Sequence, residues 1–318
     1  MDLYHLETFV RVAQGLTFTR AGEERSLSQS AVSRHIDALE KEVGMKLLVR
    51  SGRGTALTEA GTRLLEYAER LLHLSQEALR ALAELRDLES GQLTVGASTT
   101  AGHYVLGPAV AIYQDRYPGI QLRLEVRDSQ SILRMVEAGL VDVAVLPEFP
   151  AQAGVATEPY MTDELLLVAA PDHPLAPLPE VGLSDLANLP LFVRESGSNT
   201  RQTAEALLDA RHIPVRKRVL ASTEGIKQAV YTGSGLAFCS KYAVRLELQQ
   251  GLLVALTGPD FPITRQFVFA YPKGGRRPPA ALAFVALVRK MQPALETGPT
   301  GVEAQRFTTL RPKEAKHP

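Results

Sequence analysis

The sequence predicts a multidomain α/β protein with three successive parts: a small N-terminal unit of helices and a hairpin, one long helix, and a two-lobed α/β region. Three observations support this prediction. Residues 17–53 contain two short helical patterns joined by a polar turn, residues 58–89 keep an unbroken heptad of apolar side chains, and from Gly91 short apolar strands alternate with helical patterns. A chain of 318 residues is long enough for more than one domain.

The composition narrows the class of protein. Hydrophobic residues make up 45% and charged residues 22% of the chain, as in ordinary globular proteins. No run of about 18 apolar residues predicts a membrane span, and Asp2 lies where a secretory signal would be basic. Cys239 is the only cysteine, which leaves neither an internal disulfide nor a cysteine-rich zinc site. We therefore expect a cytoplasmic protein with no membrane partner, no metal and no cofactor.

Capping residues and apolar spacing define a winged helix-turn-helix over residues 1–58. Ser28 caps the third helix and Gly44 stops it, and a Gly-Arg-Gly tip turns the hairpin that forms the wing. The expected bounds are helices at 3–14, 19–25 and 28–43, with Gly15 and Thr19 as boundary residues, and a hairpin at 45–57.

The third helix opens with side chains suited to reading DNA. Gln29 can pair bidentately with adenine, and Arg34 with guanine, when the helix N-terminus enters the major groove. Ser28 is interpreted as the helix cap, and local pairing of Arg34 with Asp37 is the alternative to a DNA contact. The predicted DNA contacts are Gln29, Ser30, Ser33, Arg34, Arg50 and Arg53.

The charge balance argues against binding DNA by bulk charge. Lys and Arg total 35, as do Asp and Glu, and residues 1–65 contain nine basic and eight acidic side chains. Recognition should therefore rest on a few placed side chains, presented twice by a dimer.

The long helix, expected over residues 59–90, carries the pattern that predicts this dimer. Its apolar residues recur at alternating intervals of four and three: Ala60, Leu64, Tyr67, Leu71, Leu74, Ala78, Ala81, Leu85 and Leu88. A strict period of 3.5 residues favours a coiled-coil dimer over the alternative of a core helix within one subunit.

The remaining chain predicts two small α/β lobes with a cleft between them. Strands separated by helices indicate βαβ units and a largely parallel sheet. The strands are expected at 93–97, 121–126, 142–146, 165–169, 191–193, 218–221, 236–239, 253–256 and 266–270, and the helices at about 107–117, 130–139, 200–211, 224–232, 242–249 and 278–291. This effector region is predicted over 91–295, with lobe I at about 91–162 and 267–292, lobe II at about 163–266, and a disordered tail at 296–318.

In combination, these motifs resemble the LysR-type transcriptional regulators over residues 2 to about 292. The matching motifs are Leu6-x-x-Phe9, Ser28-Gln29-Ser30-Ala31-Val32-Ser33-Arg34-x-Ile36, Leu39-Glu40-x-x-x-Gly44 and Leu57-Thr58-x-x-Gly61. The chain departs from the family pattern at Leu47-Leu48-Val49-Arg50, usually Leu-Phe-x-Arg, and at Ala21-Gly22, usually Ala-Ala. The resemblance implies linker-helix dimers or tetramers and a sensor, similar to periplasmic binding proteins, that binds a small inducer. The implied partners are double-stranded operator DNA and a second copy of the chain, and RNA polymerase is a further candidate.

Hydroxyl-rich segments follow several predicted strands of the sensor, at the sheet edge where open α/β folds bind ligands. Ser98-Thr99-Thr100 precedes the helix expected from about Gly107, and Asp128-Ser129-Gln130, the segment 195–201 and Ser222-Thr223-Glu224-Gly225 each open a helix. The alternative is that each segment serves only as a helix cap. The resemblance places inducers at positions that match Ser98, Thr100, Ser129 and Thr200. The predicted effector contacts are Ser98, Thr99, Thr100, Ser129, Gln130, Ser196, Thr200 and Glu224, with Arg194 and Arg201 as candidate counter-charges.

The expected effector is a small anion. Exposed helix N-termini favour negative charge. The sensor also resembles the sulfur-assimilation and carbon-fixation branch of the family, through Gly96-Ala97-Ser98-Thr99-Thr100 and the run from Ser222 to Val230. A sulfur oxyanion, an organic acid or a phosphorylated compound would fit.

Functions of other classes are less well supported. An enzyme would need a catalytic constellation, and the sequence contains no Walker A motif and no HExxH. His103 and Cys239 are interpreted as packing or ligand-contacting residues rather than catalytic ones. The predicted helix-turn-helix argues against the alternative that the chain is a periplasmic solute-binding protein. A constitutive DNA-binding regulator, whose α/β region serves only oligomerisation, is the remaining alternative.

Overall fold

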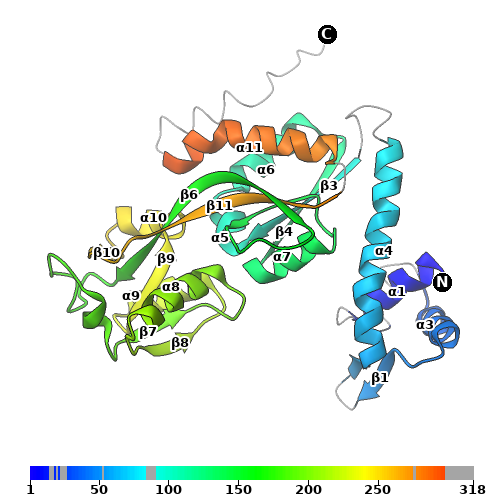
Figure 1. The fold of residues 1–318 in the computed structure, drawn as a ribbon, viewed down its shortest axis with the longest axis horizontal. Helices are drawn as coiled ribbons and strands as arrows, with labels where there is room; N and C mark the ends of the chain where they lie inside the picture. The colour runs from blue at the N-terminus through cyan, green and yellow to red at the C-terminus, as the bar shows by residue number, and fades with distance from the viewer. Residues whose placement is uncertain are drawn as a thin grey trace, which may run out of the picture. The chain divides into compact units, whose positions relative to one another are not determined.

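The computed structural model describes residues 1–13, 18, 21, 27–51, 54–83, 91–274 and 277–297. They form two compact units, one comprising the described residues up to 83 and the other nearly all of the described residues from 91 onward, and each is described by itself (Figure 1). Several predictions lie outside the described residues. They are the second helix at 19–25 with Gly15 and Thr19, Arg53 at the wing tip, Leu85 and Leu88 of the heptad, and the tail from 298 onward.

The described part of the N-terminal unit contains the first and third predicted helices, the hairpin and the start of the long helix around one small core. The elements are α1 (Leu3–Ala13), α3 (Gln29–Val43), β1 (Leu48–Ser51), β2 (Gly54–Leu57) and α4 (Glu59–Ala83). Leu6 and Phe9 of α1 are fully buried against Leu39 of α3 and Ala68 of α4. β1 and β2 pair antiparallel, which confirms the predicted hairpin. This packing buries one face of α3, which includes Val32 and Ile36, and leaves the opposite face exposed.

The predicted caps are also present. The Ser28 hydroxyl accepts a hydrogen bond from the Ala31 backbone N–H at 3.2 Å, and Gly44 ends α3 in the left-handed region with φ of 75°. Thr58 accepts from the Gly61 N–H at 2.9 Å and donates to the Lys46 carbonyl at 2.7 Å. A side chain at Gly61 would place its Cβ 2.0 Å from the Leu47 carbonyl oxygen. Gly61 therefore lets the first turn of α4 lie directly against the base of the wing.

The second unit is built on one nine-stranded sheet in the order β4-β3-β5-β11-β6-β9-β7-β8, with β10 paired to β6. The strands are β3 (Gly91–Ser98), β4 (Ile120–Arg127), β5 (Val143–Pro147), β6 (Val155–Ala169), β7 (Pro190–Val193), β8 (Arg216–Val219), β9 (Leu236–Ser240), β10 (Val254–Leu256) and β11 (Ile263–Pro272). The helices are α5 (Thr99–Tyr104), α6 (Gly107–Arg116), α7 (Ser129–Glu137), α8 (Asn199–Ala210), α9 (Thr223–Tyr231), α10 (Lys241–Gln249) and α11 (Pro279–Thr297), with a 3₁₀ turn at Leu183–Leu186.

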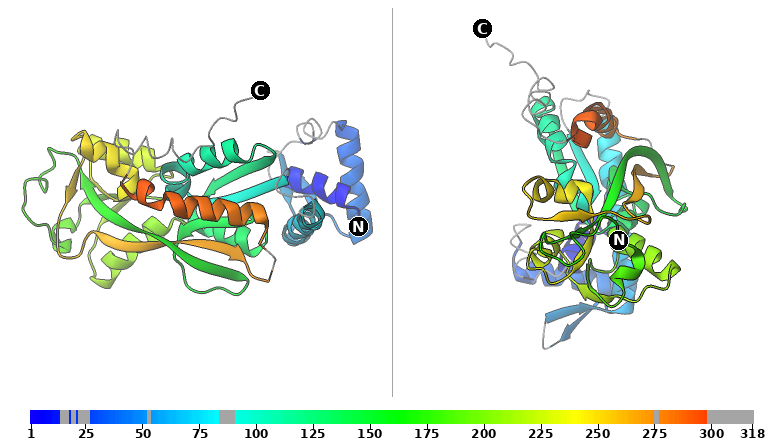
Figure 2. Two further views of the ribbon diagram at one scale, coloured as in Figure 1. Left: turned by 90° about the horizontal axis from the view of Figure 1, so that it is seen from above. Right: turned by 90° about the vertical axis from the view of Figure 1, so that its left-hand side faces the viewer.

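The prediction of a largely parallel sheet is correct only for the two ends of the sheet. β3 pairs parallel with β4 and β5, and β7 pairs parallel with β8 and β9. Between these groups, β6 and β11 are long antiparallel strands that run through both ends of the sheet (Figures 1 and 2). We call the β3–β4–β5 end with α5, α6, α7 and α11 lobe I, and the β7–β8–β9 end with α8, α9 and α10 lobe II.

Three element predictions were wrong or incomplete, each for a physical reason. The first half of β6 was missed because its exposed positions are polar and Pro159 interrupts the pattern. α5 was missed because it is only six residues long and begins at consecutive threonines. β8 was placed two residues late, since it is a fully exposed edge strand in which Arg216, Lys217 and Arg218 replace apolar side chains.

Alternation along the strands places two cores on opposite faces of each lobe. In lobe I, Val143 and Val145 face α6 and α11, whereas Ala144 and Leu146 face α7. In lobe II, the corresponding split separates a core under α8 from one under α9 and α10. Both faces of the inner strands β5, β7 and β9 are therefore covered, which explains their continuous apolar runs. Among the described residues, no helix is long and apolar enough to cross a membrane, and no cluster of side chains has the makeup of a metal site.

Candidate functional site

The N-terminal end of α3 presents most of its predicted DNA contacts to solvent. Gln29, Ser30 and Arg34 are exposed and Ser33 is half-buried, whereas Val32 on the opposite face is fully buried. Within the described part of the chain, no ion pair joins Arg34 to Asp37. The structure therefore does not support the alternative role for Arg34, a local ion pair with Asp37. The side chain of Arg50, on β1, is not described.

Glu40 is a residue of this unit whose role the sequence reasoning missed. Its carboxylate is 7% exposed and accepts hydrogen bonds from the backbone N–H groups of Leu47 and Leu48, at 2.9 and 3.3 Å. Lys46 Nζ lies 2.5 Å from the same carboxylate. Burial alone would raise the pKa of Glu40, but the bonds from Lys46, Leu47 and Leu48 outweigh it and lower the pKa. Glu40 thus ties the start of the wing to the last turn of α3.

We expect Glu40→Gln to destabilise the protein by about 2 kcal/mol at pH 7, because charge-assisted hydrogen bonds to buried backbone donors are lost. The pKa of Glu40 is lower in the folded state, so its stabilisation is present above the unfolded carboxyl pKa and is lost as pH falls through the folded pKa. Urea unfolding at pH 7 and at pH 3 measures this. The gap between wild type and variant should close at acid pH. Asp37→Asn, an exposed carboxylate one turn earlier, is the control, and equal midpoints for both variants at pH 7 would contradict the assignment.

The predicted dimer stripe of α4 divides into two parts. Ala60 and Leu64 pack against the core of their own unit. Tyr67 is 61% exposed and Leu74 is 60% exposed, and Leu71 and Ala78 are exposed beside them. Helix α4 therefore uses one apolar face inside its unit and leaves a second uncovered in the single chain.

Polar side chains from both lobes converge on one small cavity between them. The loops come from the C-terminal ends of β3, β4, β5 and β7, as the sequence analysis expected. The cavity of about 10 Å³ has about the room that one water molecule needs. It is lined by Ser98, Thr99, Thr100, Asp128, Ser129, Pro147, Arg194, Ser198, Thr200 and Arg265.

The predicted effector contacts divide between this cavity and its surroundings. Ser98, Thr99, Thr100, Ser129 and Thr200 line it, together with the counter-charge Arg194. Gln130, Ser196 and Glu224 do not. The Gln130 backbone N–H donates to the Gly197 carbonyl at 3.2 Å, Ser196 is exposed, and Glu224 belongs to a neighbouring polar cluster. Arg201 donates to the Arg194 carbonyl and pairs with Glu205 beside the cavity. Opening a helix at the correct sheet edge was thus not sufficient to place a side chain in the cavity.

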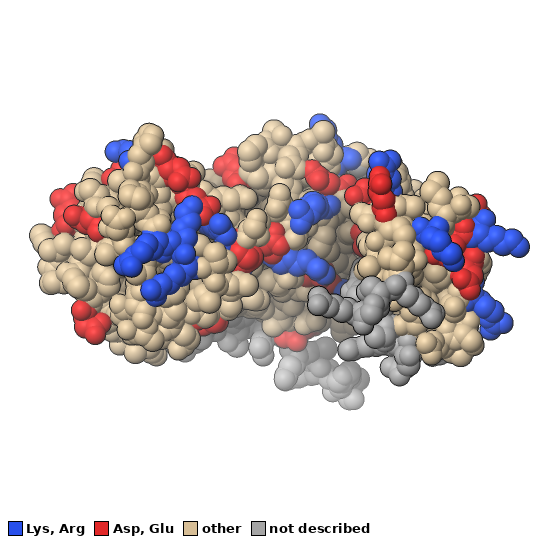
Figure 3. All heavy atoms as spheres, turned by 90° about the horizontal axis from the view of Figure 1, so that it is seen from below, with Lys and Arg blue, Asp and Glu red and all other residues tan. Residues whose placement is uncertain are grey.

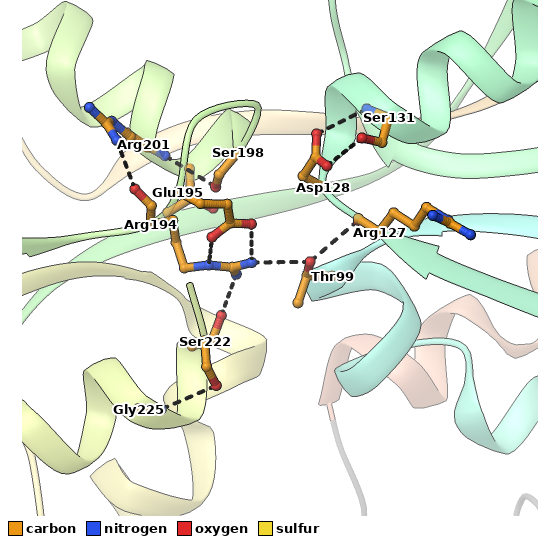
Figure 4. A network of polar contacts seen from close by, with 12 residues as sticks. Thr99, Arg127, Asp128, Ser131, Arg194, Glu195, Ser198, Arg201, Ser222 and Gly225 are labelled. Atoms are coloured by element: carbon orange, nitrogen blue, oxygen red, sulfur yellow. Dashed lines mark hydrogen bonds and ion pairs between the residues drawn. The ribbon is translucent and has the colours of Figure 1, made fainter. Parts of the chain in front are cut away.

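Arg194 lies at the centre of the cavity wall and is 7% exposed (Figure 4). Its Nε and Nη2 donate to the two carboxylate oxygens of Glu195, each at 2.7 Å. Nη2 also donates to the Thr99 hydroxyl of lobe I at 3.2 Å, and Nη1 to the Thr223 hydroxyl of lobe II at 2.6 Å. A single guanidinium therefore links both lobes.

Arg265, which the sequence analysis did not identify, is the second arginine of the cavity. Its Nε donates to Asp163 at 2.8 Å, and its Nη1 donates to Asn199 and Thr200, each at 3.1 Å. Asp163 is fully buried and also accepts from the Ser240 hydroxyl at 2.7 Å. Burial lowers the pKa of the Arg265 guanidinium, although Asp163 opposes the shift, and an arginine remains cationic. No local sequence pattern marks Arg265 or Asp163, because strands β11 and β6 bring them together from distant parts of the chain.

Two buried polar groups in the cavity wall are left without hydrogen bonds to described residues. The Ser98 hydroxyl is 3% exposed and has no hydrogen-bond partner. Arg265 Nη2 forms an ion pair with an Asp163 oxygen at 2.7 Å, but the direction of its N–H bonds does not allow a hydrogen bond to that oxygen. Unsatisfied buried polar groups cost free energy, so such groups in a cavity wall are candidates for ligand contacts.

Glu224 belongs to a second cluster that joins the lobes. Tyr104 of α5 donates its hydroxyl hydrogen to Glu224 at 2.5 Å, and Glu224 pairs with Lys227 at 2.7 Å. Lys227 is 4% exposed and also pairs with Glu247 at 2.8 Å. Burial and the bond to Glu224 raise the pKa of Tyr104 far above its usual range, so the phenol remains a donor. Nearby, burial raises the pKa of the Cys239 thiol to about 12, which fits a packing residue rather than a reactive thiolate.

Gly197 sets how closely the lobes approach beside the cavity. It has φ of 93°, and a Cβ there would lie 2.3 Å from Asp128 Oδ1. Asp128 has little room to move, because it accepts hydrogen bonds from the Ser131 N–H and hydroxyl at 2.9 and 2.5 Å. The contact between the two loops therefore requires glycine at this position.

We expect Gly197→Ala to weaken closure of the cavity more than a backbone effect alone would. The control is Gly154→Ala, since Gly154 has nearly the same φ of 92° but no atom within 4 Å of its Cβ position. Each variant should lose about 1–3 kcal/mol of stability from left-handed strain. Only Gly197→Ala should open the protein further, measured as an increase in radius of gyration by small-angle X-ray scattering. Equal radii of gyration for the two variants would refute the role of Gly197.

Two family models together match nearly the whole described chain. A family model described as "LysR substrate binding domain" matches residues 86–293, and "Bacterial regulatory helix-turn-helix protein, lysR family" matches residues 3–62. The chain is 36% identical over 285 residues to the RuBisCO operon transcriptional regulator of Allochromatium vinosum, covering 89% of this chain and 94% of that protein.

Solved structures share the fold. The regulatory domain of Synechocystis CcmR in complex with 2-PG aligns with a TM-score of 0.60 at 26% identity, covering 64% of this chain and 98% of that one. Full-length CbnR complexed with its target DNA aligns with a TM-score of 0.65 at 21% identity, covering 91% of this chain and 99% of that one. The predicted α/β architecture with an N-terminal helix-turn-helix is thereby confirmed.

Proposed function

The chain belongs to the LysR family of bacterial transcriptional regulators, and we propose that a small anionic metabolite, bound between its two lobes, controls how it engages operator DNA. The observation that carries this proposal is the cavity around Arg194. Hydroxyls from both lobes converge there on a buried cation, and the Ser98 hydroxyl has no hydrogen-bond partner among the described residues. A ligand that satisfies both lobes at once favours their closed arrangement.

We propose that the N-terminal end of α3 reads the operator. Gln29, Ser30, Ser33 and Arg34 are the proposed base- and phosphate-contacting side chains. Arg50 and Arg53, which the sequence places in the wing, belong to the same proposal. On the face in Figure 3, basic and acidic side chains are interspersed, and this is consistent with recognition by placed residues rather than bulk charge.

The exposed stripe of α4 at Tyr67, Leu71 and Leu74 supports pairing of two chains through this helix. In the proposed division of labour, residues 1–58 read DNA, 59–90 pair the subunits and 91–295 bind the effector, in the cytoplasm. A tetramer built from two such dimers and a contact with RNA polymerase belong to the same proposal.

The proposed ligand class is a small phosphorylated or carboxylated metabolite. Helix N-termini at Thr99, Ser129 and Asn199 surround the cavity, and Arg194 supplies a guanidinium. Relatives named as RuBisCO operon regulators, and the CcmR domain solved with 2-PG, favour such metabolites over sulfur oxyanions.

Thermal unfolding of the full-length protein with a panel of compounds tests this function. 2-PG, inorganic phosphate, sulfate, dicarboxylates and neutral sugars would be compared. We expect some of the phosphorylated or carboxylated compounds to raise the melting temperature in wild type, and not in Ser98→Ala or Thr100→Val, which alter the cavity wall. Ser196→Ala, on an exposed side chain, should behave as wild type. Stabilisation by neutral compounds alone would exclude an anionic effector, and stabilisation by none would favour a constitutive regulator.

A further inference from the structure

We propose that Glu195 is an internal competitor for the effector: its carboxylate occupies the face of Arg194 that a ligand anion needs, and the ligand binds by replacing it. This inference rests on the proposed function, because it concerns the same cavity. It goes further by naming the group that the ligand displaces, and it makes Glu195 the residue that sets the strength of anion binding.

The geometry of the pair matches that of a bound ligand. Both carboxylate oxygens of Glu195 accept from the fork of Arg194, at 2.7 Å to Nε and 2.7 Å to Nη2 (Figure 4). Two parallel bonds of this kind are how arginine recognises carboxylate and phosphate groups. A ligand with two terminal oxygens can form the same bonds, but not while Glu195 holds these donors.

The rest of the guanidinium would stay in place if Glu195 left. Thr223 accepts from Nη1 at 2.6 Å and Thr99 accepts from Nη2 at 3.2 Å. Thr99 is itself oriented by donating to the Arg127 carbonyl at 3.3 Å. Because these contacts come from lobes II and I, Arg194 is held by both lobes independently of its carboxylate partner.

The other arginine of the cavity cannot exchange its partner in this way. Asp163 is fully buried, and it accepts from Ser240 as well as from Arg265. Removing Asp163 would leave an uncompensated buried charge. The Glu195 side chain is 29% exposed, so it can reach solvent at low cost. Of the two arginines in the cavity, Arg194 is therefore the one whose charge a ligand can use.

The size of the cavity requires that something moves. About 10 Å³ accommodates about one water molecule and not a phosphate group. Movement of Glu195 into solvent would free Arg194, a cation that lines the cavity together with Ser98, whose hydroxyl has no hydrogen-bond partner among the described residues. The apparent affinity then equals the intrinsic affinity multiplied by the fraction of molecules in which Glu195 has left Arg194, so it falls as that fraction falls. A phosphate, with its higher charge, replaces the carboxylate more readily than a monocarboxylate does.

Glu195→Gln tests the proposal, with Asp128→Asn as the matched control. Asp128 is a carboxylate that lines the cavity directly, and its described partners are Ser131 atoms and not Arg194. Binding of 2-PG and of inorganic phosphate to the full-length protein would be measured by isothermal titration calorimetry. We expect Glu195→Gln to tighten binding by about tenfold or more, and Asp128→Asn by less than about threefold, since only the first removes a competitor.

A second pair of variants separates competition from a general charge effect. In an Arg194→Met background, Glu195→Gln should give no further gain, because the contested group is gone. An equal gain from Asp128→Asn, or a gain that persists without Arg194, would overturn the competition. If wild type and all variants bound the anions with the same affinity, the competition would be overturned and the proposed effector site would remain. Binding of neither anion to any variant would overturn both.

Discussion

Arg34→Ala is expected to abolish specific operator binding while leaving the protein folded and dimeric. Arg34 is exposed near the N-terminal end of α3, and it forms no ion pair with Asp37 in the described part of the chain. One bidentate contact with a base is worth about 1–3 kcal/mol of discrimination. Because a dimer would present Arg34 twice, the loss is about 2–6 kcal/mol, or roughly 30-fold to 20,000-fold in affinity.

Fluorescence anisotropy on a mapped operator, at one fixed salt concentration, measures this loss. Arg63→Ala is the control, since Arg63 is 79% exposed on α4 and pairs only loosely with Glu59, at 3.5 Å. Sedimentation should give the same oligomeric state for both variants. Unchanged operator affinity in Arg34→Ala would remove Arg34 from the reading surface, and an equal loss in Arg63→Ala would point to bulk charge instead.

Arg265→Met should destabilise the α/β unit by about 3–5 kcal/mol, the cost of breaking a buried ion pair by removing one partner. The variant leaves Asp163, which is fully buried, with the Ser240 hydroxyl as its remaining described donor. It also removes the hydrogen bonds that Arg265 donates to Asn199 and Thr200 at the start of α8. The link between β11, β6 and lobe II would be lost in one step.

Urea unfolding monitored by circular dichroism tests this expectation. Glu164→Gln, at the position next to Asp163, is the control, because its pair with Lys241 is exposed and should contribute about 0–1 kcal/mol. The double variant Arg265→Met with Asp163→Leu should recover part of the loss, since no unpaired charge remains. A loss below about 1 kcal/mol in Arg265→Met would contradict the structural role of the pair.

What could be predicted from the sequence depended on local signals. Ser28 and Gly44 mark the two ends of one helix through local sequence alone, and both act as expected. The hydroxyl-rich segment at Ser98 was recognisable because it follows a buried strand directly. Such signals need no knowledge of the tertiary fold.

The missing parts depend on contacts between distant segments. Arg265 meets Asp163 only because β11 and β6 pair antiparallel, and neither strand was expected at its full length. The bonds of Glu40 to Leu47 and Leu48 depend on how the wing folds back on α3. Gln130 and Glu224 occur in the correct pattern, yet their side chains lie outside the cavity, since the pattern does not specify where a side chain points.

The most direct test of the central claim joins the cavity to the DNA. Genome-wide mapping of bound DNA would supply an operator, and DNase footprints of the full-length protein would be recorded on it while 2-PG or another stabilising anion is titrated. We predict that the anion changes the footprint of wild type, at lower concentration in Glu195→Gln, and not in Arg194→Met. A footprint that stays constant while the anion binds, or that changes equally in Arg194→Met, would contradict control of DNA binding through this cavity.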